Sequence, residues 1–192
     1  MGPTAVILSE EPIGINGELF PIFLVEHSDR WLLDYNEIEA FLKKQLSHYP
    51  VTRISHIGST AINGIWAKNI VDVLIEIPNS SPLEEVAGSI ERSGFTVMFS
   101  EENRISLKKG YTKLGFANKV YHVHLRYNGD NDELYFRDYL NAHTEVAKEY
   151  EALKLKLWKK YEHDRQAYTE AKTNFIKKWT CEARKLYGDR YR

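Results

Sequence analysis

The chain has a single cysteine and no long apolar run, and each of these features excludes a class of protein. Cys181 is the one cysteine among 192 residues, so an internal disulfide is excluded and no cysteine-rich zinc module fits the sequence. No stretch approaches the roughly 20 apolar residues of a membrane-spanning helix, and the first residues lack the basic and apolar segments of a secretory signal. We therefore expect a cytoplasmic protein without a membrane partner.

The chain does contain enough apolar material for a core. Hydrophobic residues make up 43% of the sequence and aromatic residues 12%, which at this length indicates one domain, or one domain with a helical extension. We predict an irregular lead-in over residues 1–27, a core over residues 28–130, and a helical region over residues 131–192 packed on that core.

Strand and helix patterns alternate along the core and give way to helices alone. This order predicts a mixed fold of the α/β or α+β class. The predicted elements are a helix over 28–48, strands over 51–57 and 70–77, a helix over 83–93, strands over 95–99, 104–108 and 120–127 with a loop over 110–118, and helices over 132–141, 144–163 and 165–187.

Charge is divided unevenly along the chain. The net charge is −1, yet residues 143–192 hold 13 Lys and Arg against 8 Asp and Glu. A basic helical surface can face a phosphate ligand, nucleic acid or only water. Aromatic side chains lie among these cations, as in single-strand binders, but their helical spacing favours packing against other helices. Nucleic acid is therefore a conceivable partner and not the favoured one.

A glycine and a serine follow the first predicted core strand. Gly58 lets the backbone approach an anion closely, and Ser59 adds a hydroxyl to the free N–H groups of the turn. Lys68 lies four residues before Asp72, which is on the next strand. The pattern predicts a phosphate site at Gly58, Ser59 and Thr60, with Lys68 as a cation in the same cleft and Asp72 as a metal-binding carboxylate.

Asp72, Leu74 and Glu76 share one face of their strand. A two-metal site needs carboxylates at i and i+2, about 6.6 Å apart along a strand. Leu74 occupies that second position, and Glu76 lies about 13 Å away. The residues therefore predict no standard two-carboxylate site.

His122, His124 and Arg126 share one face of the strand over 120–127. If this strand neighbours that of Asp72, the imidazoles can face the carboxylate and form a mixed metal site. Such a site suits zinc, manganese or iron better than hydrated magnesium. The alternative is that both histidines only donate hydrogen bonds to nearby acids. Further candidates are Arg104, Lys108 and Lys172 as phosphate ligands, and His56, Glu76 and Arg126 as supporting residues.

The string from His56 to Asp72 also resembles a known family. A Gly-Ser turn with a carboxylate on the following strand is similar to the nucleotidyltransferase superfamily, and together with His56, Thr60 and Lys68 it resembles the GrpB family in particular. The resemblance runs from about Val25 to the last helix and includes residues 121–125, 136–143 and 168–176. It implies a nucleotidyltransferase-like mixed β-sheet with covering helices and a C-terminal helical hairpin that closes a cleft.

The resemblance implies a divalent-metal-dependent transferase that acts on a nucleotide or similar phosphate ester. Magnesium, manganese or zinc would be its cofactor, and Asp72 its catalytic carboxylate. Leu74 favours an alternative, a non-catalytic nucleotide-binding or regulatory module with a degenerate metal site. A third interpretation is an RNA-associated protein that uses the basic C-terminal helices. The site that the resemblance implies consists of Gly58, Ser59, Lys68, Asp72, His122 and His124.

Overall fold

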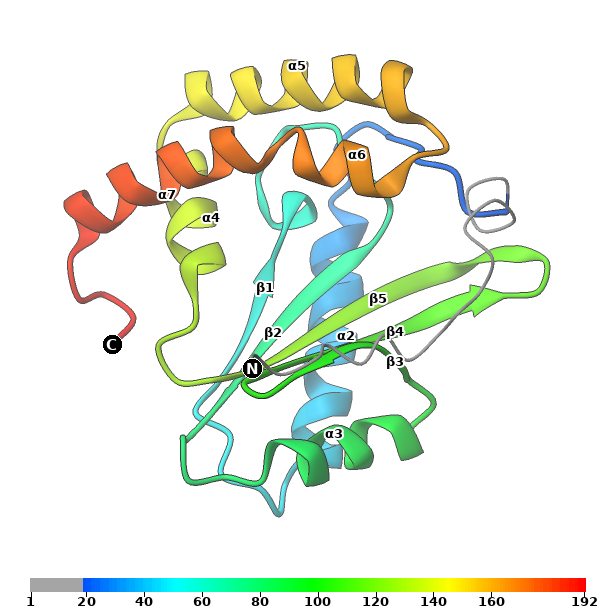
Figure 1. Ribbon diagram of the computed structural model, residues 1–192, viewed down its shortest axis with the longest axis vertical. Helices are drawn as coiled ribbons and strands as arrows, with labels where there is room; N and C mark the ends of the chain where they lie inside the picture. Colours follow the sequence, from blue (N-terminus) through cyan, green and yellow to red (C-terminus); the bar gives the residue numbers. More distant parts are fainter. Residues whose placement is uncertain (1–18) are drawn as a thin grey trace, which may run out of the picture.

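The structure, a computed structural model, describes residues 19–192 and is built on one five-stranded sheet (Figure 1). The strand order is β1-β2-β5-β4-β3. The central pair, β2 with β5, is parallel, and the other neighbours are antiparallel. The predicted mixed α/β fold is confirmed. The strands are β1 (Arg53–Ile57), β2 (Val71–Ile77), β3 (Thr96–Glu101), β4 (Arg104–Thr112) and β5 (Gly115–Tyr127).

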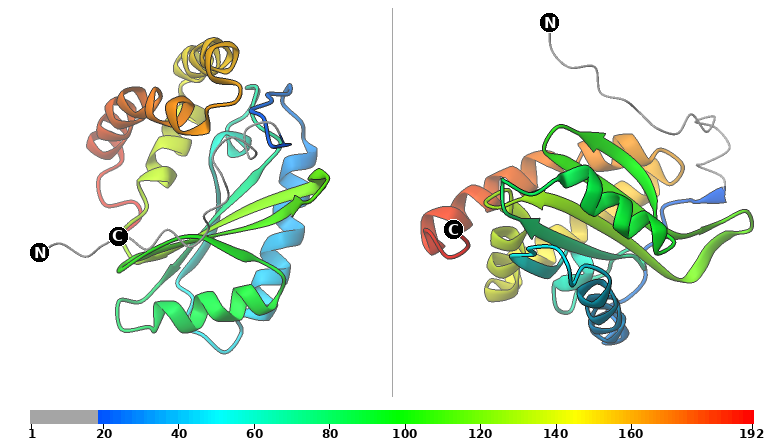
Figure 2. Two further views of the ribbon diagram at one scale, coloured as in Figure 1. Left: turned by 45° about the vertical axis from the view of Figure 1, so that its right-hand side comes forward. Right: turned by 90° about the horizontal axis from the view of Figure 1, so that it is seen from below.

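Two helices, α2 (Arg30–Gln45) and α3 (Leu83–Arg92), cover one face of the sheet (Figure 2). The main core lies between them and the sheet. Alternation along β2 turns Val71, Val73 and Ile75 toward these helices, where all are buried. Because side chains alternate along a strand, the polar residues between them point to the opposite side of the sheet.

A second layer of helices lies across that opposite side (Figures 1 and 2). Its own apolar cluster joins Phe136, Tyr150 and Val146 to the half-buried Phe175 and Trp179. The packing role predicted for the C-terminal aromatic residues is thus confirmed for this cluster. The helices are α4 (Asp132–Ala142), α5 (Thr144–Tyr161), α6 (Arg165–Glu170) and α7 (Thr173–Tyr187), and the short 3-10 helix η1 (Ser59–Ala61) precedes β2.

Two predicted elements were wrong. The loop over 110–118 is largely strand, because β4 continues to Thr112 and β5 begins at Gly115. The register shifts between Lys109 and Tyr111, at Gly110, and this irregularity breaks the alternation that marks a strand. The helix over 165–187 is also divided, into α6 and α7, and no glycine or proline in that stretch marks the break.

Of the lead-in predicted over 1–27, residues 1–18 lie outside the described part of the chain. Val25 forms an isolated bridge with Ala67, while Ile22 and Leu24 are buried against Leu157 and Tyr168 of the helical layer. This segment therefore joins the two layers. Across residues 19–192, no helix is long and apolar enough to pass through a bilayer.

Glu76, at the end of β2, is a buried carboxylate with a complete set of partners. Arg53 donates to one oxygen at 2.5 Å, and the Gly129 amide and the Asn131 side chain donate to the other at 3.0 and 2.8 Å. These contacts tie β1 and β2 to the turn between β5 and α4. The structure thus gives Glu76 a role in holding the fold together.

We expect Glu76→Ala to lower the free energy of unfolding by about 3 kcal/mol, because it removes the ion pair with Arg53 and the acceptor of the Gly129 amide and of the buried Asn131 side chain. Glu101→Ala, which removes an exposed carboxylate from β3, is the matched control and should change stability by less than about 0.5 kcal/mol. Denaturant unfolding measures both values. Equal stability of the two variants would show that the Glu76 network contributes little.

Candidate metal and phosphate site

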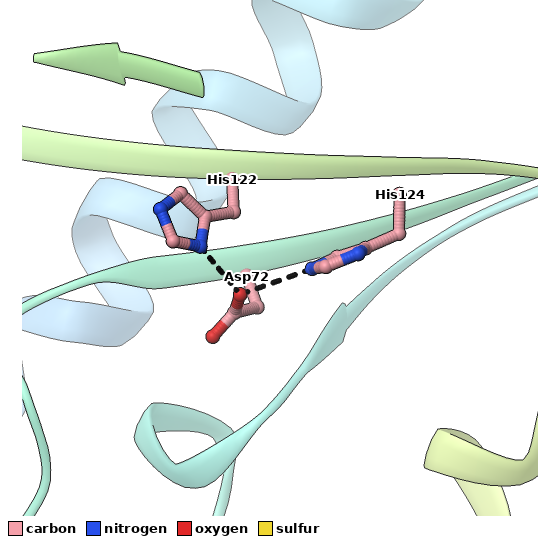
Figure 3. A group of neighbouring side chains, drawn as sticks. All are labelled: Asp72, His122 and His124. Carbon is pink, nitrogen blue, oxygen red and sulfur yellow. Dashed lines mark hydrogen bonds and ion pairs between the residues drawn. The ribbon is translucent and has the colours of Figure 1, made fainter. Parts of the chain in front are cut away.

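Asp72, His122 and His124 converge on the face of the sheet that lies opposite α2 and α3 (Figure 3). In the parallel pairing, Asp72 lies opposite His122, and Leu74 lies opposite His124. Asp72 Oδ1 is 3.3 Å from His122 Nδ1 and 3.1 Å from His124 Nε2. The potential ligand atoms all lie within 4.8 Å of one another. The expectation that the imidazoles face Asp72 is therefore confirmed as geometry.

The outer nitrogen of each imidazole also has a hydroxyl partner. Tyr111 Oη is 2.9 Å from His122 Nε2, and Ser106 Oγ is 3.3 Å from His124 Nδ1. Such partners orient metal-binding histidines in known sites. Two oriented imidazole nitrogens and one carboxylate form a donor set that fits zinc, manganese or iron.

Burial and hydrogen bonding decide the charge of these groups. Burial by itself would raise the pKa of Asp72, but the hydrogen bonds and charges of His122 and His124 hold it well below its usual value. Burial lowers the pKa of His122, against the opposing effect of Asp72. An ionised carboxylate and a neutral imidazole are the forms that bind a metal ion.

The turn after β1 brings its backbone directly against Asp72. Gly58 has φ 74° and ψ −175°, a conformation that is essentially restricted to glycine. A Cβ at this position would lie 2.5 Å from Asp72 Oδ2. Ser59 opens η1, and its hydroxyl is hydrogen-bonded to Tyr150 of α5. The predicted phosphate turn thus lies beside the carboxylate.

His56 and Thr60 have structural partners. Thr60 Oγ1 lies 2.9 Å from His56 Nε2 and donates to the Ile70 carbonyl at 3.2 Å. The His56 ring stacks on Tyr35 with centroids 4.8 Å apart. Burial lowers the pKa of His56 to about 4, so this histidine is neutral at neutral pH and holds the base of the turn in place.

We call Asp72, His122 and His124 the candidate metal group. Asp72 and His122 of this group line one cleft together with the turn, and the cleft, about 1080 Å³ in volume, lies between the sheet and the helical layer. Lys68, Lys154, Arg165 and Lys172 also line this cleft, and we call these residues the cationic wall. Within residues 19–192, none of them forms an ion pair with a carboxylate. Burial lowers the pKa of Lys68 to about 8 and those of Lys154 and Lys172 to about 7, and neighbouring cations of the wall add to each shift.

The other predicted cations lie elsewhere or are paired. Arg104 lines the cleft, but it donates to both Asp130 oxygens at 2.6 Å. Lys108 stands over the ring of Tyr111, 4.7 Å from its centroid. The structure therefore brings Lys68 and Lys172, but neither Arg104 nor Lys108, to the cationic wall. Arg126 forms ion pairs with Asp130 and Glu133 and supports that end of the sheet.

The sequence interpretation did not select Lys154, Arg165 or Tyr150 for the site. Lys154 is 1% exposed and follows Tyr150 by one helical turn on the buried stripe of α5. A lysine at an apolar stripe position was therefore a signal that could have been used. No comparable signal marks Arg165, whose direction depends on the short helix α6.

Comparison with known proteins supplies the family and the fold. The family model described as GrpB protein matches residues 21–182. Glutamate-rich protein GrpB of Alkalihalophilus pseudofirmus is 33% identical over 174 residues, which are 85% of this chain and 95% of that protein. The crystal structure of conserved protein GrpB from Enterococcus faecalis has a TM-score of 0.72 and 30% identity, and the match covers 86% of this chain and 99% of that one.

More distant matches have the nucleotidyltransferase fold and include a poly(U) polymerase. Cid1 poly(U) polymerase with Mg 3′-dATP bound gives a TM-score of 0.52 at 10% identity, over 76% of this chain and 49% of that one. The GLD-2/RNP-8 complex gives 0.52 at 14% identity, over 77% and 58%. Both matches concern the fold alone, and they confirm the predicted nucleotidyltransferase-like core.

We expect Gly58→Ala to disturb the site more than its backbone strain explains, because the new methyl group collides with Asp72. The matched control is Gly64→Ala, which has a similar φ of 70° but nothing within 4 Å of the added Cβ. Backbone strain costs about 1–3 kcal/mol at a positive φ and acts on stability in both variants, so Zn²⁺ affinity is the deciding measurement. Denaturant unfolding and Zn²⁺ titration should show an additional loss of stability and of metal affinity in Gly58→Ala only. Equal losses in the two variants would contradict this account of the turn.

Proposed function

We propose that this chain, which belongs to the GrpB family, binds a divalent metal ion and a nucleotide or other phosphate ester in one cleft and acts there as a nucleotidyltransferase-like enzyme. One observation carries the proposal. Asp72 and His122 of the candidate metal group, the Gly58–Ser59 turn and the cationic wall all line the same cleft, and His124 lies beside Asp72. Cid1, which shares the fold, has been solved with Mg 3′-dATP bound, and this similarity supports a phosphate-bearing ligand.

Each part of the cleft has a separate task in this proposal. Ser59 and the N–H groups of its turn donate hydrogen bonds to phosphate oxygens, and Lys68, Lys172 and Arg165 neutralise them. Asp72, His122 and His124 would hold the metal ion, which when bound stabilises negative charge on the reacting phosphate group. Lys154 also donates to the Trp66 carbonyl and so anchors the loop that carries Lys68.

A second candidate function is a nucleotide-binding module without catalysis. Leu74 is fully buried and packs with Ile57 and Leu134, so the strand position of a second carboxylate belongs to a small apolar core. That arrangement favours binding without turnover. The two candidates differ in whether a bound nucleoside triphosphate transfers its nucleotidyl group to an acceptor and releases pyrophosphate.

We expect Zn²⁺ or Mn²⁺ together with a nucleotide such as ATP or UTP to raise the melting temperature by several degrees at about 100 times the dissociation constant. Asp72→Asn should weaken metal binding by more than about 100-fold, since outer partners of metal ligands alone contribute about 10- to 100-fold. Asp132→Asn is the control, because it removes an exposed cleft carboxylate that pairs with Arg184 instead of an imidazole.

The pattern of these shifts decides between the candidates. Stabilisation that requires metal and nucleotide together, followed by pyrophosphate release, supports the transferase. Nucleotide binding that is indifferent to metal but lost in Ser59→Ala supports the non-catalytic module. Unchanged metal binding in Asp72→Asn would remove this carboxylate from the site and overturn the leading proposal.

The same cleft should take up protons when a polyphosphate binds. Lys154 and Lys172 have a pKa of about 7, and Lys68 of about 8, in the empty cleft. At pH 8, Lys154 and Lys172 are therefore largely neutral, and Lys68 is about half charged. An anion between them favours the charged form and raises each pKa, so binding draws protons from the buffer. Calorimetry of pyrophosphate binding, in buffers of different ionisation enthalpy, should give roughly two protons taken up per ligand.

Lys172→Met should reduce that uptake by roughly one proton, because its amine forms no hydrogen bond with residues 19–192 and lies 4.3 Å above the Tyr168 ring. Lys177→Met removes an exposed cation at the cleft rim and should leave the uptake unchanged. Binding of pyrophosphate without any proton uptake would show that the wall is already charged in the empty cleft.

A further inference from the structure

One chain of hydrogen bonds connects the cationic wall to the candidate metal group. Arg165 of α6 donates from Nη1 to Tyr111 Oη at 3.0 Å. Tyr111 Oη is in turn 2.9 Å from His122 Nε2, and His122 Nδ1 is 3.3 Å from Asp72 Oδ1. Arg165 also lines the cleft. A ligand that contacts Arg165 therefore acts on the first member of a chain that ends at Asp72.

The register shift at Gly110 is what turns Tyr111 toward this chain. Lys109 pairs with Tyr121 and points to the α3 side of the sheet, where it donates to the Ser93 carbonyl. In a regular strand Tyr111 would share that face, because side chains alternate with a period of two. The shift places the Tyr111 hydroxyl on the His122 face instead. An added Cβ at Gly110 would lie 2.3 Å from the Lys119 carbonyl oxygen.

The donors in this series of hydrogen bonds determine which atoms carry the protons when no metal is bound. Arginine has donors only, so Tyr111 Oη accepts from Arg165. Within the described residues, the one acceptor that contacts the Tyr111 hydroxyl is His122 Nε2. Tyr111 therefore donates to Nε2, and the ring proton of neutral His122 lies on Nδ1, from which it is donated to Asp72.

A metal ion between His122 and Asp72 requires the opposite tautomer. To bind the metal, Nδ1 would have to present its lone pair, so the ring would lose the proton at Nδ1 and gain one at Nε2, with no net change in charge. Nε2–H would then need an acceptor. Tyr111 Oη is in place for that role once its own proton turns away from Nε2 and toward the bound anion. Arg165 opposes the change, because while it donates to Tyr111 the hydroxyl proton is directed at Nε2. An anion that draws the guanidinium away removes this opposition.

We propose that Tyr111 is a positioning residue for His122 under the control of Arg165, so that an anion bound to Arg165 favours the His122 tautomer that can hold a metal ion. The inference rests on the proposed function for its metal and its anion. It adds a coupling between the two ligands that neither Lys68 nor Lys172 provides, since neither is hydrogen-bonded to Tyr111. By linkage, metal binding favours anion binding to the same extent.

A double-mutant cycle on Zn²⁺ affinity tests the coupling in the absence of anion. Tyr111→Phe keeps the ring contacts with Phe20 and Phe116 and should weaken Zn²⁺ binding about 10-fold, as loss of an outer partner does. At pH 6, where Lys172 is largely charged as well as Arg165, Arg165→Met should strengthen Zn²⁺ binding more than Lys172→Met, which removes a like charge without touching Tyr111. That excess should disappear in the Tyr111→Phe background. An excess of the same size in both backgrounds would overturn the proposal.

A spectroscopic measurement reports the tautomer itself. In protein with ¹⁵N-labelled histidine, the signals of His122 are identified by their loss in His122→Gln. We expect the Nδ1–H tautomer in metal-free protein and the Nε2–H tautomer at Zn²⁺ saturation. Persistence of Nδ1–H at saturation would overturn the proposal. Sodium sulfate at constant ionic strength should raise Zn²⁺ affinity more in the native protein than in Tyr111→Phe, and an equal rise in both would also overturn it.

The outcomes separate this inference from the function on which it rests. If Zn²⁺ and the anion both bind but neither changes the affinity of the protein for the other, the metal and phosphate site stands and the coupling through Tyr111 is wrong. If neither Zn²⁺ nor pyrophosphate binds to the native protein, the proposed function fails and the coupling fails with it.

Discussion

The parallel pairing of β2 with β5 is the constraint on which the cleft depends. It sets Asp72 directly opposite His122, while Val73 and Val123 on the other face are buried under α2 and α3. A slip of one residue would move these valines into the cleft and the charged and imidazole groups into the core. Apolar burial on one face therefore fixes the polar geometry on the other, and the carboxylate and the imidazoles are held together without any metal.

The helical layer completes the site by fixing the loop between β1 and β2. Asn141 bonds to the Asn63 amide and the Ala61 carbonyl, and Glu151 accepts from the Trp66 amide. These contacts hold the segment between Ser59 and Lys68 against α4 and α5. The same layer buries lysines beside one another, which is unfavourable in an empty cleft and becomes favourable when an anion lies between them. This electrostatic arrangement supports the proposed ligand of negative charge.

The sequence predicted those parts of the molecule that depend on local pattern. The alternation in β2 and β5 placed Asp72, His122 and His124 on polar faces, and neighbouring strands then brought them together. The contributions of Tyr111 and Arg165 could not be found in this way. Tyr111 reaches the site through a register shift at Gly110, and Arg165 through a helix break that no residue type marks. Both depend on tertiary packing that strand and helix periods do not encode.

The charge of this site differs from the charge of a site built on several carboxylates. A divalent ion held by one carboxylate and neutral imidazoles keeps a net positive charge, whereas two or three carboxylates would cancel it. The cationic wall adds further positive charge in the same cleft. In the proposed function, together they would favour a ligand with several negative charges and a metal that accepts imidazole nitrogen over one that prefers oxygen. The fold alone does not decide this preference, which comes from the residues at Leu74, His122 and His124.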